Sequence, residues 1–215
     1  MKSNLTVNPW TAIWLHPRET IRAIINFNPK YRFILLSIIY GLPMAFNTAQ
    51  NYSLSDAIPL WAIVLGAILL CGFFGALAIT IGSALLTWTG KWIGGKGSFD
   101  KVRCAVAWSS GVPSSVIVVT WAVLIATFGP QAFSRMFAET PFVGYQAGIV
   151  FLVFLIESIV WVWSLVMLFK TLAEVHGFSA WKAVLNVIIA FAIVFALVWF
   201  LGWIFWGQTQ VVVVK

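Results

Sequence analysis

The stretch AGIVFLVFLIESIVWVWSLVMLF, residues 147–169, decides the fold of this 215-residue chain, and Glu157 is its one charged residue. Roughly 20 residues of helix cross the hydrocarbon core of a bilayer, so the stretch is long enough to span a membrane. A charge near the middle of such a span costs on the order of 3 kcal/mol even on lenient insertion scales. Glu157 is therefore expected to be protonated, to be paired, or to face a wet cavity inside a helix bundle.

The composition of the chain is that of an integral membrane protein. The chain is 61% hydrophobic and 9% charged, with a mean hydropathy of +0.97, whereas soluble domains have about 25% charged residues. The net charge of +7 comes mainly from short connectors and is interpreted as a topology signal, so no nucleic-acid partner is expected. Cys71 and Cys104 match no metal or redox spacing, so neither a metal nor a cofactor is expected.

Five apolar stretches are long enough to cross a membrane, at about residues 33–51, 58–88, 104–128, 147–169 and 183–206. They are continuously apolar, whereas the strands of a membrane barrel alternate within segments of about ten residues. Helices also satisfy their own backbone groups in lipid. The sequence predicts an all-α, five-helix transmembrane bundle over residues 33–208, with a cytoplasmic or interfacial segment at 1–32 and a short outer tail at 209–215.

Basic residues are concentrated in alternate connectors. The amino-terminal segment and the connectors after the second and fourth spans hold eleven of the thirteen lysines and arginines: Lys2, Arg18, Arg22, Lys30, Arg32, Lys91, Lys96, Lys101, Arg103, Lys170 and Lys182. Arg135 and Lys215 remain for the other side. An excess of Lys and Arg marks the cytoplasmic side of a membrane protein, so the amino terminus is predicted inside and the carboxyl terminus outside.

The amino-terminal segment is predicted to contain a short helix that begins at Pro17, because proline suits the first helical turn. Its apolar residues are interspersed with charged ones: Trp10, Ile13, Trp14, Ile21, Ala23, Ile24 and Ile25 accompany Arg18, Glu19 and Arg22. Such a helix lies in the membrane interface, with arginines toward anionic headgroups and the tryptophans as anchors. The alternative is a cytoplasmic element that packs against the bundle.

Residues that loosen helices occur at a depth similar to that of Glu157. They are Gly41 and Pro43 in the first span, Gly72 and Gly75 in the second, and Pro113 in the third, flanked by Ser109, Ser110, Gly111, Ser114 and Ser115. Proline frees a helix carbonyl, which needs a partner in lipid. We expect a small polar cavity, with Ser164 as the hydrogen-bonding residue on the face of Glu157. Alternatively, the small residues only allow close helix packing, as Gly72 with Ala76 and Ala78 with Gly82 could.

The fourth connector and the amino-terminal segment are expected to meet, with Glu174 and His176 near His16, Arg18 and Glu19. These groups could bind a metal, but their spacing matches no ligand signature, and an exposed ion-pair cluster is the preferred interpretation. The candidate cytoplasmic interaction face comprises Trp10, Trp14, His16, Arg18, Glu19, Arg22, Glu174 and His176. The sequence has no nucleophile or phosphate-binding pattern, and residues 90–97 are interpreted as a flexible connector. No enzymatic activity is predicted.

Two parts of the sequence resemble a known family. The first comprises Trp10, Ile13, Trp14, Pro17, Arg18, Thr20 and Ile21, and the second is LAEVHGFSAWKA at residues 172–183. With the five spans, the chain resembles bacterial members of the Yip family, the Ypt/Rab-interacting membrane proteins, over residues 10–206. The resemblance implies a multi-pass protein of the bacterial cytoplasmic (inner) membrane, with its amino terminus inside and no established enzymatic activity.

The chain also differs from the eukaryotic relatives in this family, which are associated with prenylated Rab GTPases and with traffic between endoplasmic reticulum and Golgi. Their long soluble amino-terminal region and their Asp-Leu-Tyr-Gly-Pro motif are missing. Tyr40 and Gly41 match part of that motif, and Trp108, Ser109 and Pro113 are similar to a Tyr-Ser-Pro pattern in the third span. A Rab-binding role is therefore not carried over to this chain.

Two functions are compatible with these features. The preferred hypothesis is a non-enzymatic membrane protein whose cytoplasmic face recruits or organises other membrane components. Its expected partners are membrane lipids and either a protein at that face or further copies of the chain. The alternative is a small transporter, channel or lipid-moving protein that uses the midplane residues, with Glu157 as a proton or cation site and Pro113 as a flexible point. An odd number of spans, without an evident inverted repeat, counts against transport.

Overall fold

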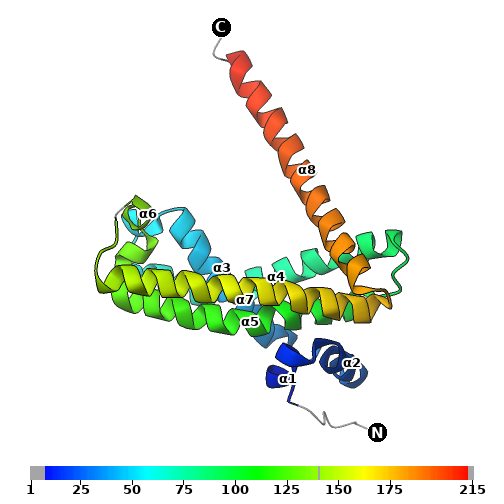
Figure 1. Ribbon diagram of the computed structural model, residues 1–215. Helices are drawn as coiled ribbons and strands as arrows, with labels where there is room; N and C mark the ends of the chain where they lie inside the picture. Colours follow the sequence, from blue (N-terminus) through cyan, green and yellow to red (C-terminus); the bar gives the residue numbers. More distant parts are fainter. Residues whose placement is uncertain (1–7, 140, 213–215) are drawn as a thin grey trace.

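The computed structural model describes residues 8–139 and 141–212, and for residues 136, 138 and 205–212 it describes the backbone alone. Within these residues every regular element is a helix (Figure 1). The helices are α1 (Pro9–Leu15), α2 (Pro17–Phe27), α3 (Phe33–Asn51), η1 (Leu54–Asp56), α4 (Leu60–Trp92), α5 (Phe99–Phe128), η2 (Gly129–Phe133), α6 (Met136–Glu139), α7 (Tyr145–His176) and α8 (Ala180–Val212).

The prediction of five spans is confirmed, because α3, α4, α5, α7 and α8 are each long and apolar enough to cross a membrane. α4 begins at Leu60, two residues later than predicted, since Pro59 is its N-cap. α7 has 32 residues and continues to His176. At about 1.5 Å per residue it is roughly 48 Å long, whereas the hydrocarbon core is about 30 Å thick. α7 therefore extends beyond the hydrocarbon.

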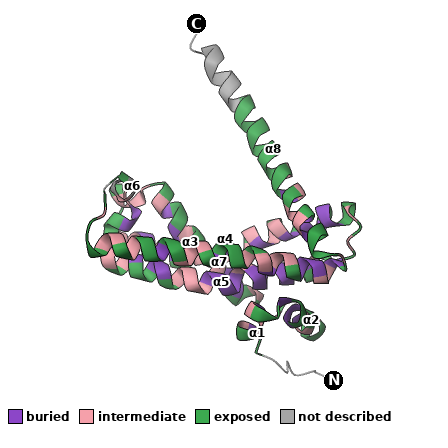
Figure 2. Cartoon of the chain, viewed as in Figure 1, coloured by how far each residue is buried: buried purple, intermediate pink, exposed green. Residues whose placement is uncertain are grey.

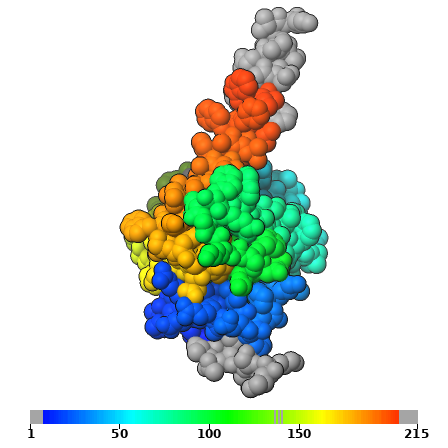
Figure 3. Space-filling model, turned by 90° about the vertical axis from the view of Figure 1, so that its right-hand side faces the viewer, coloured from blue at the N-terminus to red at the C-terminus, as the bar shows by residue number. Residues whose placement is uncertain are grey.

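The bundle has two distinct ends. We call the end that carries the α4–α5 and α7–α8 connectors the basic end, and the opposite one the far end. α4, α5 and α7 lie side by side along the bundle, while α1 and α2 lie against its flank toward the basic end (Figure 1). Figure 3 looks onto the basic end, where the amino-terminal helices, the α4–α5 connector and the start of α8 form one surface.

The helix predicted to begin at Pro17 is α2, and it packs against the bundle. Its buried residues, Pro17, Thr20, Ile21 and Ile24, recur at helical spacing and face α7 and α5. α1 was not predicted, although the sequence contains a helix N-cap residue followed by a proline at its start. Asn8 Oδ1 accepts the backbone N–H of Trp10 at 3.1 Å, and Pro9 occupies the first helical position.

Two apolar cores lie along the bundle. The core toward the basic end contains ten residues with no exposed surface: Ile13, Ile21, Ile24, Leu36, Val102, Ala105, Trp108, Met167, Leu172 and Ala183. The core toward the far end is largely aromatic and includes Phe46, Trp121, Leu124, Phe128, Phe133 and Val153. Because the first core contains residues of α1 and α2, the amino-terminal helices are part of the folded unit.

α3 and α4 cross at two glycines. A Cβ atom on Gly41 would lie 1.9 Å from the main-chain oxygen of Cys71, and one on Gly75 would lie 2.0 Å from that of Ser37. Only glycine permits this approach, so the close-packing interpretation is confirmed for these two positions. Gly41 and Pro43, which the sequence placed among the helix-loosening residues, do not end α3, which continues through both to Asn51.

α8 packs on α4 and α7 only near its start and then projects away from the bundle (Figure 1). Ala183, Asn186 and Ala190 are buried, whereas from Phe191 to Ile204 every large apolar side chain except the half-buried Ile193 is exposed (Figure 2). The helix continues to Val212, into the predicted tail at 209–215. Residues 213–215 of that tail and residues 1–7 of the predicted 1–32 segment lie outside the described residues.

Candidate functional site

His176 is the last residue of α7, and it is enclosed by the α4–α5 connector. Its side chain is 1% exposed and stacks on Phe178, with the ring centroids 4.9 Å apart. Its Nδ1 accepts the backbone N–H of Gly97 at 3.3 Å, and its carbonyl accepts that of Lys96 at 3.0 Å. Nε2 has no hydrogen-bond partner among the described residues. His176 therefore links the α4–α5 connector, through Lys96 and Gly97, to the α7–α8 connector, through Phe178.

Glycines make room for the imidazole of His176. A Cβ on Gly90 would lie 2.5 Å from its Cε1, one on Gly95 would lie 2.4 Å from its Nδ1, and one on Gly97 would lie 2.9 Å from its Nδ1. Side chains at these positions would overlap the ring. The residues between Trp92 and Phe99 form the α4–α5 connector, and Gly90, Gly95 and Gly97 are packing positions against His176.

Glu174, two residues before the end of α7, binds α2 through Arg22 rather than through the predicted Arg18. Arg22 Nε donates to Glu174 Oε1 at 2.7 Å. That hydrogen bond and the charge of the carboxylate raise the pKa of Arg22 above its usual value, so the guanidinium stays charged. The side chain of Arg22 is exposed, and an exposed ion pair contributes little to the free energy of unfolding. Its main effect is to fix the position of α2 against α7.

The predicted exposed cluster of five charged or titratable residues does not form as expected. Among the described residues, no hydrogen bond or ion pair joins Glu174 or His176 to His16, Arg18 or Glu19. His176 is buried, which is a correction, and Glu174 is paired with Arg22. Within the same described range, no three His, Cys, Asp or Glu side chains are placed to hold a metal.

α1 is held by aromatic contacts and one hydrogen bond. Trp10 packs edge-on against the buried Trp108 at 5.7 Å between ring centroids, and Tyr31 stacks on the same indole at 6.2 Å. Trp163 Nε1 on α7 donates to the main-chain oxygen of Trp14 at 3.2 Å. Trp10 and Trp14 are thus half-buried and anchor α1 to the bundle. These two residues are therefore not part of an exposed interaction face, as had been predicted.

The remaining exposed residues form what we call the docking face: Leu15, His16, Arg18 and Glu19 on α1 and α2. Leu15 is an apolar side chain with 73% of its surface exposed. It is the last residue of α1, and Arg18 and Glu19, which follow it closely in sequence, lie on α2, whose opposite side is buried. The docking face is therefore held on the bundle by the buried side of α2, while its own side chains are exposed.

Within the membrane-spanning part, Glu157 on α7 lies against α5. Its Oε1 is 2.6 Å from the hydroxyl of Thr120. The sequence placed Ser164 on the same face of its helix as Glu157, and both side chains bond α5, Glu157 at Thr120 and Ser164 at the carbonyl of Ser109. Thr120 was missed because its position opposite Glu157 depends on how α5 is rotated, which the apolar pattern of that span does not specify.

Ser164 instead compensates for Pro113. Proline has no backbone N–H, so the carbonyl four residues earlier, that of Ser109, loses its helical donor. Ser164 Oγ donates to this carbonyl oxygen at 2.9 Å. The expectation that the carbonyl freed by Pro113 needs a partner from a neighbouring helix is confirmed, and α5 continues through Pro113 to Phe128.

Replacing Ser164 with alanine is expected to cost about 1–2 kcal/mol, because it leaves the Ser109 carbonyl without a donor in an apolar environment. In a Pro113→Ala background the same change should cost much less, since residue 113 again donates its own N–H. Ser158→Ala is the matched control, because Ser158 bonds only its own helix, to Phe154 O at 2.7 Å. Thermal unfolding of the four variants in detergent measures the difference. Equal costs in both backgrounds would contradict this pairing.

Three of the predicted midplane residues make separate local contacts. Ser114 donates to Ser110 O at 2.8 Å within its own helix, and Pro43 O accepts from Asn47 Nδ2 at 3.0 Å. Gly41 lies at the α3–α4 crossing. The small residues at this depth therefore serve helix packing and local hydrogen bonding rather than a common site.

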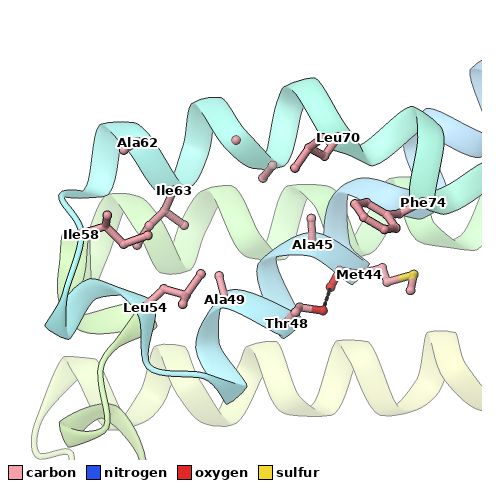
Figure 4. A pocket seen from close by; sticks show the side chains of 12 residues that line it. Met44, Ala45, Thr48, Ala49, Leu54, Ile58, Ala62, Ile63, Leu70 and Phe74 are labelled. Carbon is pink, nitrogen blue, oxygen red and sulfur yellow. Dashed lines mark hydrogen bonds between the residues drawn. The ribbon is translucent and has the colours of Figure 1, made fainter.

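A pocket of about 430 Å³ lies elsewhere, in the fork between α3 and α4 toward the far end (Figure 4). Its lining is almost wholly apolar: Met44, Ala45, Thr48, Ala49, Leu54, Ile58, Ala62, Ile63, Gly66, Ala67, Leu70 and Phe74. The hydroxyl of Thr48 donates to Met44 O at 2.8 Å on its own helix. Neither Glu157 nor Pro113 contributes to this pocket, so it is not the predicted polar cavity.

Comparison with known proteins gives one match. A family model described as the Yip1 domain matches residues 11–201 of the chain. The matched range begins within α1 and ends within the exposed part of α8, so it includes the docking face, the whole of α3, α4, α5 and α7, and α8 as far as residue 201. No curated protein and no solved structure matches the chain.

Proposed function

The chain belongs to the Yip1 domain family, and from that membership we propose that it is a non-enzymatic, multi-pass membrane protein that recruits or organises other membrane components. Its docking face is the proposed contact surface for a protein partner, and lipid surrounds its apolar helices. The observation that carries the proposal is the arrangement of α2. One side of this helix is buried in the bundle, while Arg18 and Glu19 on the other side are exposed.

We further propose that the basic end lies in the cytoplasm of a bacterial cell, with the chain in the inner membrane. Eleven of the thirteen lysines and arginines belong to the amino-terminal segment, to the α4–α5 connector, or to the ends of α4, α5, α7 and α8 that adjoin the two connectors. Such an excess is retained on the cytoplasmic side during insertion. The resemblance to bacterial members of the family supports the same placement.

This orientation predicts opposite labelling of two introduced cysteines. In right-side-out vesicles, a membrane-impermeant maleimide should modify a cysteine at Arg135, and should modify one at Lys96 only after the membrane is opened. Both positions are exposed in the structure, and the native Cys71 and Cys104 are buried. Labelling of the Lys96 position in sealed vesicles would contradict the proposed orientation.

The proposed role is tested by charge reversal at the docking face. Arg18→Glu should weaken partner binding by roughly tenfold or more, because like charges placed across an interface cost several kcal/mol. The bundle should remain folded, since an acidic residue in the first turn of a helix is favourable. Arg135→Glu reverses an exposed arginine in the α5–α7 connector and serves as the matched control.

The readout is quantitative mass spectrometry of what copurifies after mild extraction from the native membrane. Loss of one stoichiometric protein from Arg18→Glu, with retention by Arg135→Glu, is expected. Equal recovery by both variants, or recovery of nothing but lipid and further copies of the chain, would count against the recruiting role.

A further inference from the structure

Glu157 and Thr120 form a small hydrogen-bonded unit between α7 and α5. Thr120 is 5% exposed, and its Oγ1 lies 2.6 Å from Glu157 Oε1 and 2.8 Å from the carbonyl oxygen of Ile117. A hydroxyl group has one proton to donate. Thr120 therefore cannot donate to both oxygens, and the location of the protons decides the chemistry of this unit.

No charge compensates Glu157 from the neighbouring helices. Residues 33–51, 60–90, 104–128 and 183–204 contain no Lys, Arg, His, Asp or Glu, and Glu157 is the one such residue between 147 and 169. The other titratable groups there are Tyr40, Cys71 and Cys104. Tyr40 and Cys104 pack in the core toward the basic end, and Cys71 Sγ donates to Ile68 O on its own helix.

An ionised Glu157 would accept one hydrogen bond among the described residues, from Thr120, and would have no cation beside it. A charged side chain in this position costs on the order of 3 kcal/mol or more, and a single neutral donor compensates only part of that cost. A carboxylic acid satisfies the geometry without a charge. It donates its proton to Thr120 Oγ1, and the hydroxyl then donates its own proton to Ile117 O.

We propose that Glu157 is a proton-binding site, which holds its proton in the folded protein and donates it to Thr120. The bound proton allows α7 to cross the bilayer without a net charge. It also links α7 to α5 on the far side of Pro113, while the Ser164–Ser109 hydrogen bond links the same two helices on the other side. This assignment is independent of the proposed recruiting role, because the docking face does not contact Glu157.

Infrared spectroscopy of the full chain in phosphatidylcholine nanodiscs at pH 7 tests the proposal. The wild type minus Glu157→Gln spectrum should show one protonated-carboxyl C=O band that shifts when water is replaced by D₂O. Glu139→Gln is the control, because Glu139 is exposed on α6 and its removal should delete carboxylate bands alone. Loss of carboxylate bands from Glu157→Gln would overturn the proposal.

Variants of Thr120 test the proposed acceptor. Thr120→Val keeps the shape of the side chain and removes the hydroxyl, so the acid C=O band of Glu157 should move to the frequency of a less hydrogen-bonded acid. Thr120→Ser should leave the band in place. An unchanged band in Thr120→Val would overturn the assignment of Thr120. If this variant does not fold, the Glu157→Gln comparison still decides the protonation of Glu157.

Discussion

Replacing Gly75 with alanine is expected to lower the stability of the bundle by about 3 kcal/mol or more, at the upper end of overpacking costs. The new Cβ would lie 2.0 Å from the main-chain oxygen of Ser37. Backbone atoms cannot rotate aside as a flexible side chain can, so α3 and α4 would have to separate. Since native proteins are stable by only about 5–15 kcal/mol, such a loss leaves little margin.

The loss of stability can be measured through the reactivity of the two native cysteines. Cys71 and Cys104 are 3% and 2% exposed, so each thiol reacts with a fluorescent maleimide only when its helix opens. The reaction midpoint of Cys104, which lies on α5 away from the substitution, should fall by roughly 6–12 °C for a loss of this size. Gly66→Ala, also on α4, is the control, because its Cβ would meet nothing within 4 Å. An equal fall in both variants would show that the glycine crossing is not the cause.

Replacing Gly90 with alanine is expected to cost about 2–3 kcal/mol by forcing His176 out of its enclosure. The three nearest atoms to a Cβ at this position all belong to the imidazole, at 2.5, 2.7 and 3.1 Å. The ring cannot move away freely, because Gly95 and Gly97 approach it from other directions. Its displacement would also break the hydrogen bond from Gly97 to Nδ1 and loosen the α4–α5 connector.

A double-mutant cycle isolates this contact. His176→Ala removes the ring, so adding Gly90→Ala to it should have little further effect, and the two costs should not add. Limited trypsin digestion at the exposed Lys96 should accelerate in Gly90→Ala, and Gly82→Ala, whose Cβ meets nothing within 4 Å, should behave as wild type. Additive costs in the cycle would contradict the enclosure of His176 by glycines.

The elements of the fold follow from local sequence. Continuous apolar stretches give the five spans, and Pro17 marks the start of α2. The sequence also predicted that a carbonyl near Pro113 would need a hydrogen-bond donor, because any proline within a helix lacks the backbone N–H. α1 could have been found in the same way, since Asn8 and Pro9 are a cap and a first-turn proline.

The contacts of the candidate sites could not be predicted, since they join residues far apart in the chain. Arg22 and Glu174 are 152 residues apart in sequence, and Thr120 and Glu157 are 37 apart. An apolar helix gives little indication of which side faces its neighbours, because lipid and protein interior favour the same residues. His176 was expected at the surface for a related reason. Its enclosing glycines are far from it in the chain, and a glycine-rich stretch in a sequence is typical of an exposed loop.

The structure also changes where a partner should be sought. Trp14 is half-buried and its carbonyl is bonded to α7, whereas Leu15 is 73% exposed on the docking face. Leu15 is thus the better position for a photo-crosslinking residue. Val143, before α7, is similarly exposed at 75% and provides the matched position at the far end.

The most direct test of the recruiting role is site-specific photo-crosslinking in intact cells, with the crosslinker at Leu15 or at Val143. The account predicts one saturable protein adduct from Leu15 that is absent from Val143 and is lost when Arg18→Glu is added. If Leu15 yields the same adducts as Val143, or an adduct that survives Arg18→Glu unchanged, the docking face does not recruit a partner.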